Sequence, residues 1–132
     1  MLTALKDDAC MYLAEYQGEG MDEKKVIAGI IVTYYGDTAI YYFGASGNEY
    51  RNLMAPYLLQ FHAIKKAKEK GLNWYDFLGI APEDAGKGHS LAGVSGFKLK
   101  FGGKTVQYMK AKELVYKSFW YWVMRIRKGI SG

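Results

Sequence analysis

Apolar runs separated by turn residues constrain the fold of this chain more than any other feature. Three β-type segments follow one another, at residues 9–17, 25–35 and 38–43. The sequence GEGMDE separates the first two, and Gly36-Asp37 separates the last two. Gly-Asp between two apolar runs is typical of a tight hairpin. We therefore expect an antiparallel meander at the start of the fold.

A lysine-rich helix is predicted after this meander. Pro56 is suited to a first helical turn, and Gly71 supplies a stop signal. The apolar residues expected to share one face of this helix are Leu58, Phe61, Ile64 and Ala67.

The remaining segments are predicted from shorter patterns. We expect a short aromatic strand at 73–77, a loop or short helix at 79–96, a strand at 105–109 and a last helix at about 112–128. The order β-β-β-α-β-(loop or short α)-β-α predicts a mixed α/β (α+β) sheet with helices packed on it. The third strand, the helix and the fourth strand form a crossover that places a binding crevice at strand ends.

Composition indicates one domain with a substantial core, because half of the 132 residues are hydrophobic. The net charge of +5 favours a polyanionic partner such as RNA, a phosphorylated substrate or an anionic membrane surface. The single cysteine, Cys10, fits a reducing compartment and is interpreted as a buried thiol. The acidic N-terminal region lacks a signal-peptide core, so a cytoplasmic location is predicted.

Hydrolytic and metal chemistry find little support in the sequence. His62 and His89 have no further histidine or cysteine at metal-ligand spacing, so no metal site is predicted. A triad drawn from Ser90, His89 and Asp84 lacks a nucleophile elbow. Walker and GxGxxG motifs are absent. Residues 38–70 resemble the acyl-CoA-binding part of GNAT acetyltransferases, but the usual Q/R-x-x-G-x-G/A pattern is absent.

Four short motifs in a fixed order carry a more specific resemblance. They are Y-x-G-A-S, A-P-Y-L-L, Y-D-F-x-G-I and F-K-x-x-F-G-G, within a match that runs from about residue 9 to the end. In these motifs the chain resembles the Fem family of peptidoglycan-bridge aminoacyltransferases. The resemblance implies a GNAT-like fold that moves an amino acid from aminoacyl-tRNA to the stem peptide of a peptidoglycan precursor. It implies no cofactor, with aminoacyl-tRNA as co-substrate.

The stretch GVSGFKLKFGGKT, residues 93–105, suits neither a helix nor a strand well, and the resemblance assigns it to the site of transfer. Lys98 would stabilise the oxyanion formed when the acceptor amine attacks the aminoacyl ester. Phe97 would pack near the terminal adenosine of the tRNA, and Gly102 and Gly103 would let the backbone turn. Without the resemblance, Lys98 would be interpreted as part of a solvated basic edge and Phe97 as a loop anchor.

Two further residues are predicted to bind substrate. By the resemblance, Tyr42 in YYFGAS would contact the nucleotide-linked or lipid-linked precursor, although a core tyrosine also fits the alternation. Arg51, near the start of the main helix, is suited to a phosphate. Asp76 is expected to order the loop after its strand. The aromatic and basic last helix is compatible with contact at the inner membrane surface, with core packing as the favoured interpretation.

Fem proteins are longer and contain two GNAT-like domains, and residues 1–132 resemble the C-terminal part of the second one. The chain is therefore interpreted as a single, partial GNAT-like domain, truncated on its N-terminal side, which should expose apolar surface and a strand edge. Such exposed surface would be covered if the chain is part of a longer reading frame, pairs with a complementing chain or forms a homodimer. The alternatives to the transferase are a non-catalytic RNA- or protein-binding module and an acyl-CoA-dependent N-acyltransferase. The transferred amino acid, the acceptor position and the form of the precursor stay open.

Overall fold

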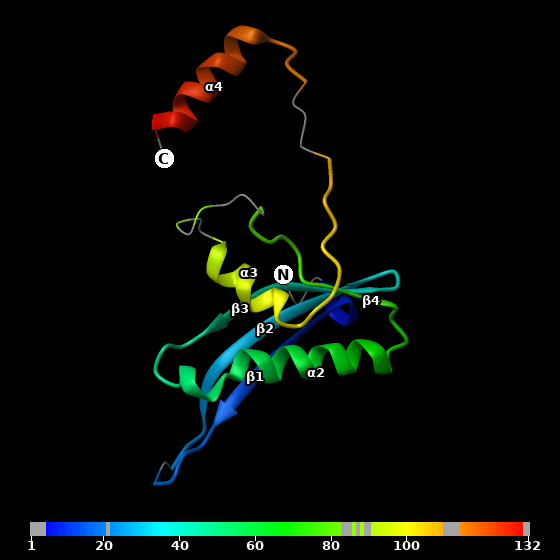
Figure 1. Ribbon diagram of the computed structural model, residues 1–132, viewed down its shortest axis with the longest axis vertical. Coiled ribbons are helices and arrows are strands. Elements are labelled where there is room, and N and C mark those ends of the chain that lie inside the picture. The colour runs from blue at the N-terminus through cyan, green and yellow to red at the C-terminus, as the bar shows by residue number, and fades with distance from the viewer. Residues whose placement is uncertain are drawn as a thin grey trace. The chain divides into compact units, whose positions relative to one another are not determined.

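The computed structural model describes residues 5–20, 22–82, 86, 88, 91–109 and 114–130. The chain divides into two compact units, Met1–Phe101 and Gly102–Gly132. Among the described residues, the first unit contains a sheet with helices α2 and α3, and the second contains helix α4 (Figure 1).

Four strands form one sheet in the order β1-β2-β3-β4 (Figure 1). They are β1 (Ala9–Tyr16), β2 (Lys25–Tyr35), β3 (Thr38–Ser46) and β4 (Trp74–Asp76). The first three strands pair antiparallel, which confirms the predicted meander, and β4 pairs parallel with β3. The sheet is thus mixed, as the α/β (α+β) prediction requires.

The turn between β2 and β3 also holds β4 in place. Gly36 has a φ of 58°, a left-handed conformation that glycine adopts readily. The Asp37 carbonyl accepts hydrogen bonds from the backbone N–H groups of Asn73 and Trp74, at 2.9 and 3.2 Å. The Asn73 side-chain amide donates to the Asp37 carboxylate at 3.2 Å. These three bonds bring Trp74 beside Thr38, where the parallel pairing begins.

Helix α2 (Ala55–Glu69) follows a 3-10 turn, η2 (Arg51–Leu53), and packs on one face of the sheet (Figure 1). Its buried residues are Ala55, Leu59, Gln60, Ala63 and Ala67. The three alanines bring the helix backbone close to the sheet.

The predicted buried face of α2 is only partly correct. Ala67 is buried, but the side chains of Leu58 and Phe61 are 65% and 66% exposed. Apolar residues occur around most of this helix, so spacing alone did not identify the side that faces the sheet. The predicted helix boundaries were close, because Pro56 lies in the first turn and Gly71 follows the end.

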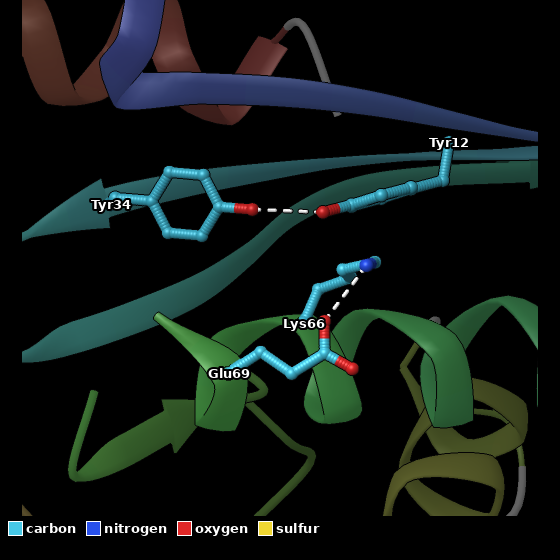
Figure 2. Close-up of polar contacts among 4 residues, drawn as sticks. All are labelled: Tyr12, Tyr34, Lys66 and Glu69. Atoms are coloured by element: carbon cyan, nitrogen blue, oxygen red, sulfur yellow. Dashed lines mark hydrogen bonds and ion pairs between the residues drawn. The ribbon is translucent and has the colours of Figure 1, made fainter. Parts of the chain in front are cut away.

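Polar contacts on the α2 side of the sheet are shown in Figure 2. The Tyr12 and Tyr34 hydroxyls, on β1 and β2, point toward each other and form a 2.9 Å hydrogen bond. Burial raises the pKa of Tyr12 above its ordinary value, and the bond to Tyr34 adds to the shift. The Tyr12 ring meets His62 of α2 edge-on at 5.3 Å. The Lys66–Glu69 ion pair (2.8 Å) links two solvent-exposed side chains of α2, and such exposed pairs stabilise little (Figure 2).

The sheet face away from α2 is apolar and solvent-exposed. It carries the exposed side chains of Met11, Leu13 and Phe43. The expected exposure of apolar surface is therefore confirmed. Strand β1 lies at one edge of the sheet and pairs only with β2 among the strands of the described residues.

The second unit differs from the prediction in two ways. The strand expected at 105–109 is wrong, since residues 102–109 are irregular and pair with no strand of the described part of the chain. Helix α4 (Ser118–Ile130) begins later than the predicted start near residue 112. Residues 114–117 are not helical, and residues 110–113 lie outside the described residues. The Tyr121 N–H donates to the Lys117 carbonyl at 3.1 Å, so the first turn forms there.

No helix within the described ranges is both long enough and apolar enough to cross a membrane. The segment 79–96, expected to be a loop or short helix, contains the start of helix α3 (Ala92–Leu99). Asp84, His89 and Ser90, from the unsupported triad, lie outside the described residues.

Candidate functional site

Helix α3 carries Phe97 and Lys98 in its last turn. The expectation that this stretch suits no helix is wrong for Ala92–Leu99, although its glycines weaken it intrinsically. Tertiary contacts compensate: the buried Ser95 hydroxyl accepts a 2.7 Å hydrogen bond from the Ala81 N–H and donates one of 2.7 Å to the Leu91 carbonyl. Helix α3 is thereby attached to the segment that follows β4.

Replacing Ser95 with alanine should lower the free energy of unfolding by about 1–2 kcal/mol, because the Ala81 N–H loses its partner in a part-buried position. Urea denaturation followed by circular dichroism measures the change. Ser46→Ala, at an exposed position, is the matched control and should have little effect. Equal stability of Ser95→Ala and the parent would contradict the attachment of α3 through this side chain.

Six aromatic rings form a continuous group beside α3, which we call the aromatic cluster. Its members are Tyr41, Tyr57, Tyr75, Phe77, Phe97 and Phe101. Phe97 meets Tyr57 edge-on with centroids 4.8 Å apart, and Phe101 stacks on Tyr57 at 5.5 Å and on Phe77 at 5.2 Å. These separations are the ones aromatic pairs favour. Phe97 and Phe101 therefore join α3 to α2 and to the segment after β4.

The ammonium group of Lys98 lies at the border of this cluster. Its Nζ donates a 2.8 Å hydrogen bond to the Gly79 carbonyl and stands 5.8 Å from the centre of the Tyr41 ring, within cation–π range. The side chain is partly buried. Burial lowers the pKa of the Lys98 ammonium, and the Asp76 carboxylate opposes part of that shift. Lys98 is thus a positioned cation with reduced access to water.

The lowered pKa predicts that Lys98 titrates below the ordinary lysine value of 10.5 in the folded protein. The unfolded chain then binds more protons between the two pKa values, so stability rises with pH across that window. NMR titration of ¹³Cε-labelled lysine measures this pKa directly, and the Lys98→Arg variant assigns the signal. A midpoint at or above 10.5 would contradict the burial of this ammonium group.

A buried polar network lies next to Lys98, and sequence reasoning missed it. Gln60 of α2 is 0% exposed, and its Oε1 accepts a 2.7 Å hydrogen bond from the Tyr75 hydroxyl. Gln60 Nε2 has no hydrogen-bond partner within the described residues. Burial raises the pKa of Tyr41, and the nearby Gln60 amide opposes that shift. The sequence did contain a signal for this network: Gln60 directly follows Leu59 on the buried side of α2, where a polar residue needs a hydrogen-bond partner.

Strand β3 presents Tyr41 to this network through a β-bulge. Ile31 pairs with Phe43 and Val32 pairs with Tyr41, so Tyr42 is the extra residue. A Cβ atom at Gly44 would overlap the Tyr41 hydroxyl. Gly44 thus leaves the space that the Tyr41 side chain occupies, as glycines within strands often do.

The structure does not bring Tyr42 to the Lys98 site. Tyr42 is 55% exposed and lines a surface pocket whose other residues are Leu5, Asp8, Thr33, Tyr34 and Tyr35. Its neighbour Tyr41, and not Tyr42, stands beside the Lys98 ammonium.

Arg51 lies in a different element from Lys98, which belongs to helix α3. It begins the turn η2, and Met54, with a φ of 52°, separates this turn from α2. Arg51 is exposed, and no described side chain is recorded as an ion-pair partner for it. Arg51 therefore lies in the turn before the main helix, with its side chain open to solvent.

Gly102 and Gly103 follow the aromatic cluster directly and have φ values of 72° and 99°. These conformations confirm that the two glycines let the backbone turn after Phe101. The Asp76 carboxylate accepts a 2.7 Å hydrogen bond from the Leu78 N–H, so it orders the loop after β4 as expected. Among the described residues, no three His, Cys, Asp or Glu side chains are grouped to hold a metal ion.

Curated and solved relatives resemble part of this chain. The lipid II:glycine glycyltransferases of Staphylococcus epidermidis and Staphylococcus aureus are 33% and 32% identical to it over 76 residues. That alignment covers 58% of this chain and 18% of each relative. A crystal structure of FemX matches with a TM-score of 0.52 and 32% identity, over 58% of this chain and 19% of that protein.

The chain thus spans about a fifth of the length of these relatives. The likeness to FemX agrees with the mixed sheet and its helices, which confirms the predicted fold class. A model of the FemAB family matches residues 6–128, which is nearly the whole sequence. The chain therefore belongs to the FemAB family.

Proposed function

We propose that this chain takes part in the transfer of an amino acid from aminoacyl-tRNA to the stem peptide of a peptidoglycan precursor. The observation that carries the proposal is the partly buried Lys98 ammonium, positioned by the Gly79 carbonyl and the Tyr41 ring. Membership of the FemAB family supports it, as do relatives named lipid II:glycine glycyltransferase. Such a transfer builds the cross-bridge of the cell wall.

The proposed reaction is an aminolysis of an ester. The amino group of the acceptor attacks the carbonyl carbon that links the amino acid to the tRNA, and a tetrahedral intermediate with one oxyanion forms. The carbon–oxygen ester bond then breaks, an amide bond remains, and the tRNA hydroxyl leaves with the proton that the amine has lost. The substrate itself is proposed to assist this proton transfer. The protein mainly has to stabilise the oxyanion.

Lys98 is chemically suited to that task. An ammonium group has three N–H donors, and the Gly79 carbonyl uses one of them. Two donors remain for a substrate oxygen. Because the side chain is partly buried, its charge acts through a medium less polarisable than bulk water and so interacts more strongly. The contacts with Gly79 and Tyr41 reduce the reorganisation needed when the oxyanion forms.

The other predicted site residues are assigned supporting roles in this proposal. Phe97 presents a partly buried ring next to Lys98 in sequence, and a base at the end of the tRNA is proposed to stack on this ring. Gly102 and Gly103 turn the chain away after Phe101. Tyr42, in its surface pocket, and Arg51, in the turn before α2, are proposed to bind the precursor. We place the reaction on the cytoplasmic side of the membrane, where charged tRNA is available.

Mass spectrometry of reactions with a mixed pool of charged tRNAs tests the proposal. Nucleotide-linked and lipid-linked precursors are offered separately, and free amino acids with uncharged tRNA serve as the control. We expect a mass increase of one amino acid on one precursor, only with charged tRNA. A folded chain that binds tRNA but transfers to neither precursor would favour a non-catalytic binding module. Thermal stabilisation by acetyl-CoA would instead favour an acyl-CoA-dependent enzyme.

A further inference from the structure

The basic character of this protein is confined to its C-terminal quarter. Residues 102–132 contain seven lysines and arginines and one glutamate, a net charge of +6. Residues 1–101 contain eleven basic and twelve acidic residues, a net charge of −1. A polyanionic partner is therefore attracted mainly to the second unit, and the unit that holds Lys98 contributes no net attraction.

Helix α4 of this unit has a continuous apolar face, and two further apolar residues, Trp120 and Met124, lie outside it. Phe119, Trp122, Val123 and Ile126 recur at spacings of three and four residues and so share a face. Phe119 and Trp122 are 67% and 62% exposed, although both are large and apolar. Arg125 lies off this face, and its guanidinium stands 6.0 Å from the centre of the Tyr121 ring.

Together these properties are those of a helix that lies in a membrane interface. We propose that α4 binds the surface of an anionic lipid bilayer, with its apolar face among the acyl chains and its basic residues at the headgroups. A helix of 13 residues is about 20 Å long, too short to span the hydrocarbon core. Tryptophan and tyrosine favour the boundary between headgroups and acyl chains.

A bilayer fits this helix better than RNA does. RNA binding would use stacked aromatic rings and cations directed at the same strand. In α4 the shared face also contains the aliphatic side chains of Val123 and Ile126, which gain from hydrocarbon and not from a base or a phosphate. The inference goes beyond the proposed transferase and is independent of it, since vesicle binding requires neither tRNA nor precursor.

Cosedimentation of the full chain with vesicles tests this proposal. One set of vesicles contains equal parts of phosphatidylglycerol and phosphatidylcholine, and the other contains phosphatidylcholine alone. We expect binding at least about tenfold tighter to the anionic vesicles, and a decrease as salt is added. In a Trp74→Phe background, tryptophan emission should shift to shorter wavelength on binding, because only Trp120 and Trp122 then remain.

Two variants separate the apolar and the electrostatic contributions. Phe119→Ser with Trp122→Ser should abolish binding, and Arg125→Glu with Lys117→Glu should remove the preference for anionic lipid. The matched control is Leu58→Ser with Phe61→Ser on α2, where the apolar side chains are equally exposed. This control should bind vesicles as the parent does. Circular dichroism verifies that each variant is folded.

Three results would overturn the proposal. Equal binding to both kinds of vesicle would mean that the basic residues of the second unit do not select anionic lipid. Loss of binding in the α2 variant and not in the α4 variants would assign the interaction to the first unit. Binding of tRNA that the charge-reversal variant abolishes, with no vesicle binding by the parent, would identify RNA as the partner of α4.

Discussion

Replacing Lys98 with alanine is expected to reduce the rate of aminoacyl transfer by about 100- to 1000-fold, the usual loss when one oxyanion-stabilising donor is removed. Lys98 is the cation that the Gly79 carbonyl and the Tyr41 ring hold beside the aromatic cluster. The loss should appear in kcat and leave the affinity for tRNA nearly unchanged, because the interaction forms only in the transition state. Single-turnover transfer measured by mass spectrometry gives the rate.

Two variants test whether Lys98 acts through its charge or only through its hydrogen bond to the Gly79 carbonyl. Lys98→Gln keeps a donor able to approach the Gly79 carbonyl but lacks the charge, so it should remain folded and be as inactive as Lys98→Ala. Lys100→Ala removes an exposed cation that stands 5.7 Å from the Tyr57 ring, and it should retain activity. Full activity of Lys98→Gln would assign Lys98 a structural role. An equal loss in Lys100→Ala would indicate general attraction of tRNA.

Local signals predicted the first unit well. Strand β2 has the predicted bounds, and Gly36 forms the expected turn. Strand β3 continues to Ser46, three residues beyond the predicted end at Phe43, because the bulge at Tyr42 keeps Gly44 and its neighbours paired with β2. The strand at 105–109 was wrong for the opposite reason. Its residues have strand-like types, but no described strand pairs with them.

The site was only partly predictable because its parts come together through tertiary contacts. The motif identified Phe97 and Lys98, and the structure places them at the aromatic cluster. The neighbours Tyr41 and Gln60 come from a strand and a helix far from them in sequence, so no local spacing joined them to Lys98. Tyr42 was predicted from its position in the family motif, and strand alternation with an unrecognised bulge did not reveal that Tyr41 stands beside Lys98.

Replacing Gly44 with alanine is expected to lower the free energy of unfolding by about 1–3 kcal/mol, the usual cost of adding a methyl group to a filled site. The new Cβ would lie 2.9 Å from Cζ and 3.0 Å from Cε2 of Tyr41 and would overlap its hydroxyl. The ring cannot move away freely, because Phe77 lies edge-on to it at 6.3 Å and Lys98 stands over it. Urea denaturation measures the loss.

The matched control is Gly47→Ala, in which the nearest atom to the new Cβ is the Ile27 carbonyl oxygen at an ordinary 3.8 Å. This variant should be nearly as stable as the parent. A double-mutant cycle with Tyr41→Ala then isolates the clash: with the ring removed, Gly44→Ala should cost much less than it does in the parent. An unchanged cost would mean that the backbone at Gly44, and not the space occupied by Tyr41, requires glycine. If the displaced Tyr41 also disturbs Lys98, Gly44→Ala will slow transfer, whereas Gly47→Ala will not.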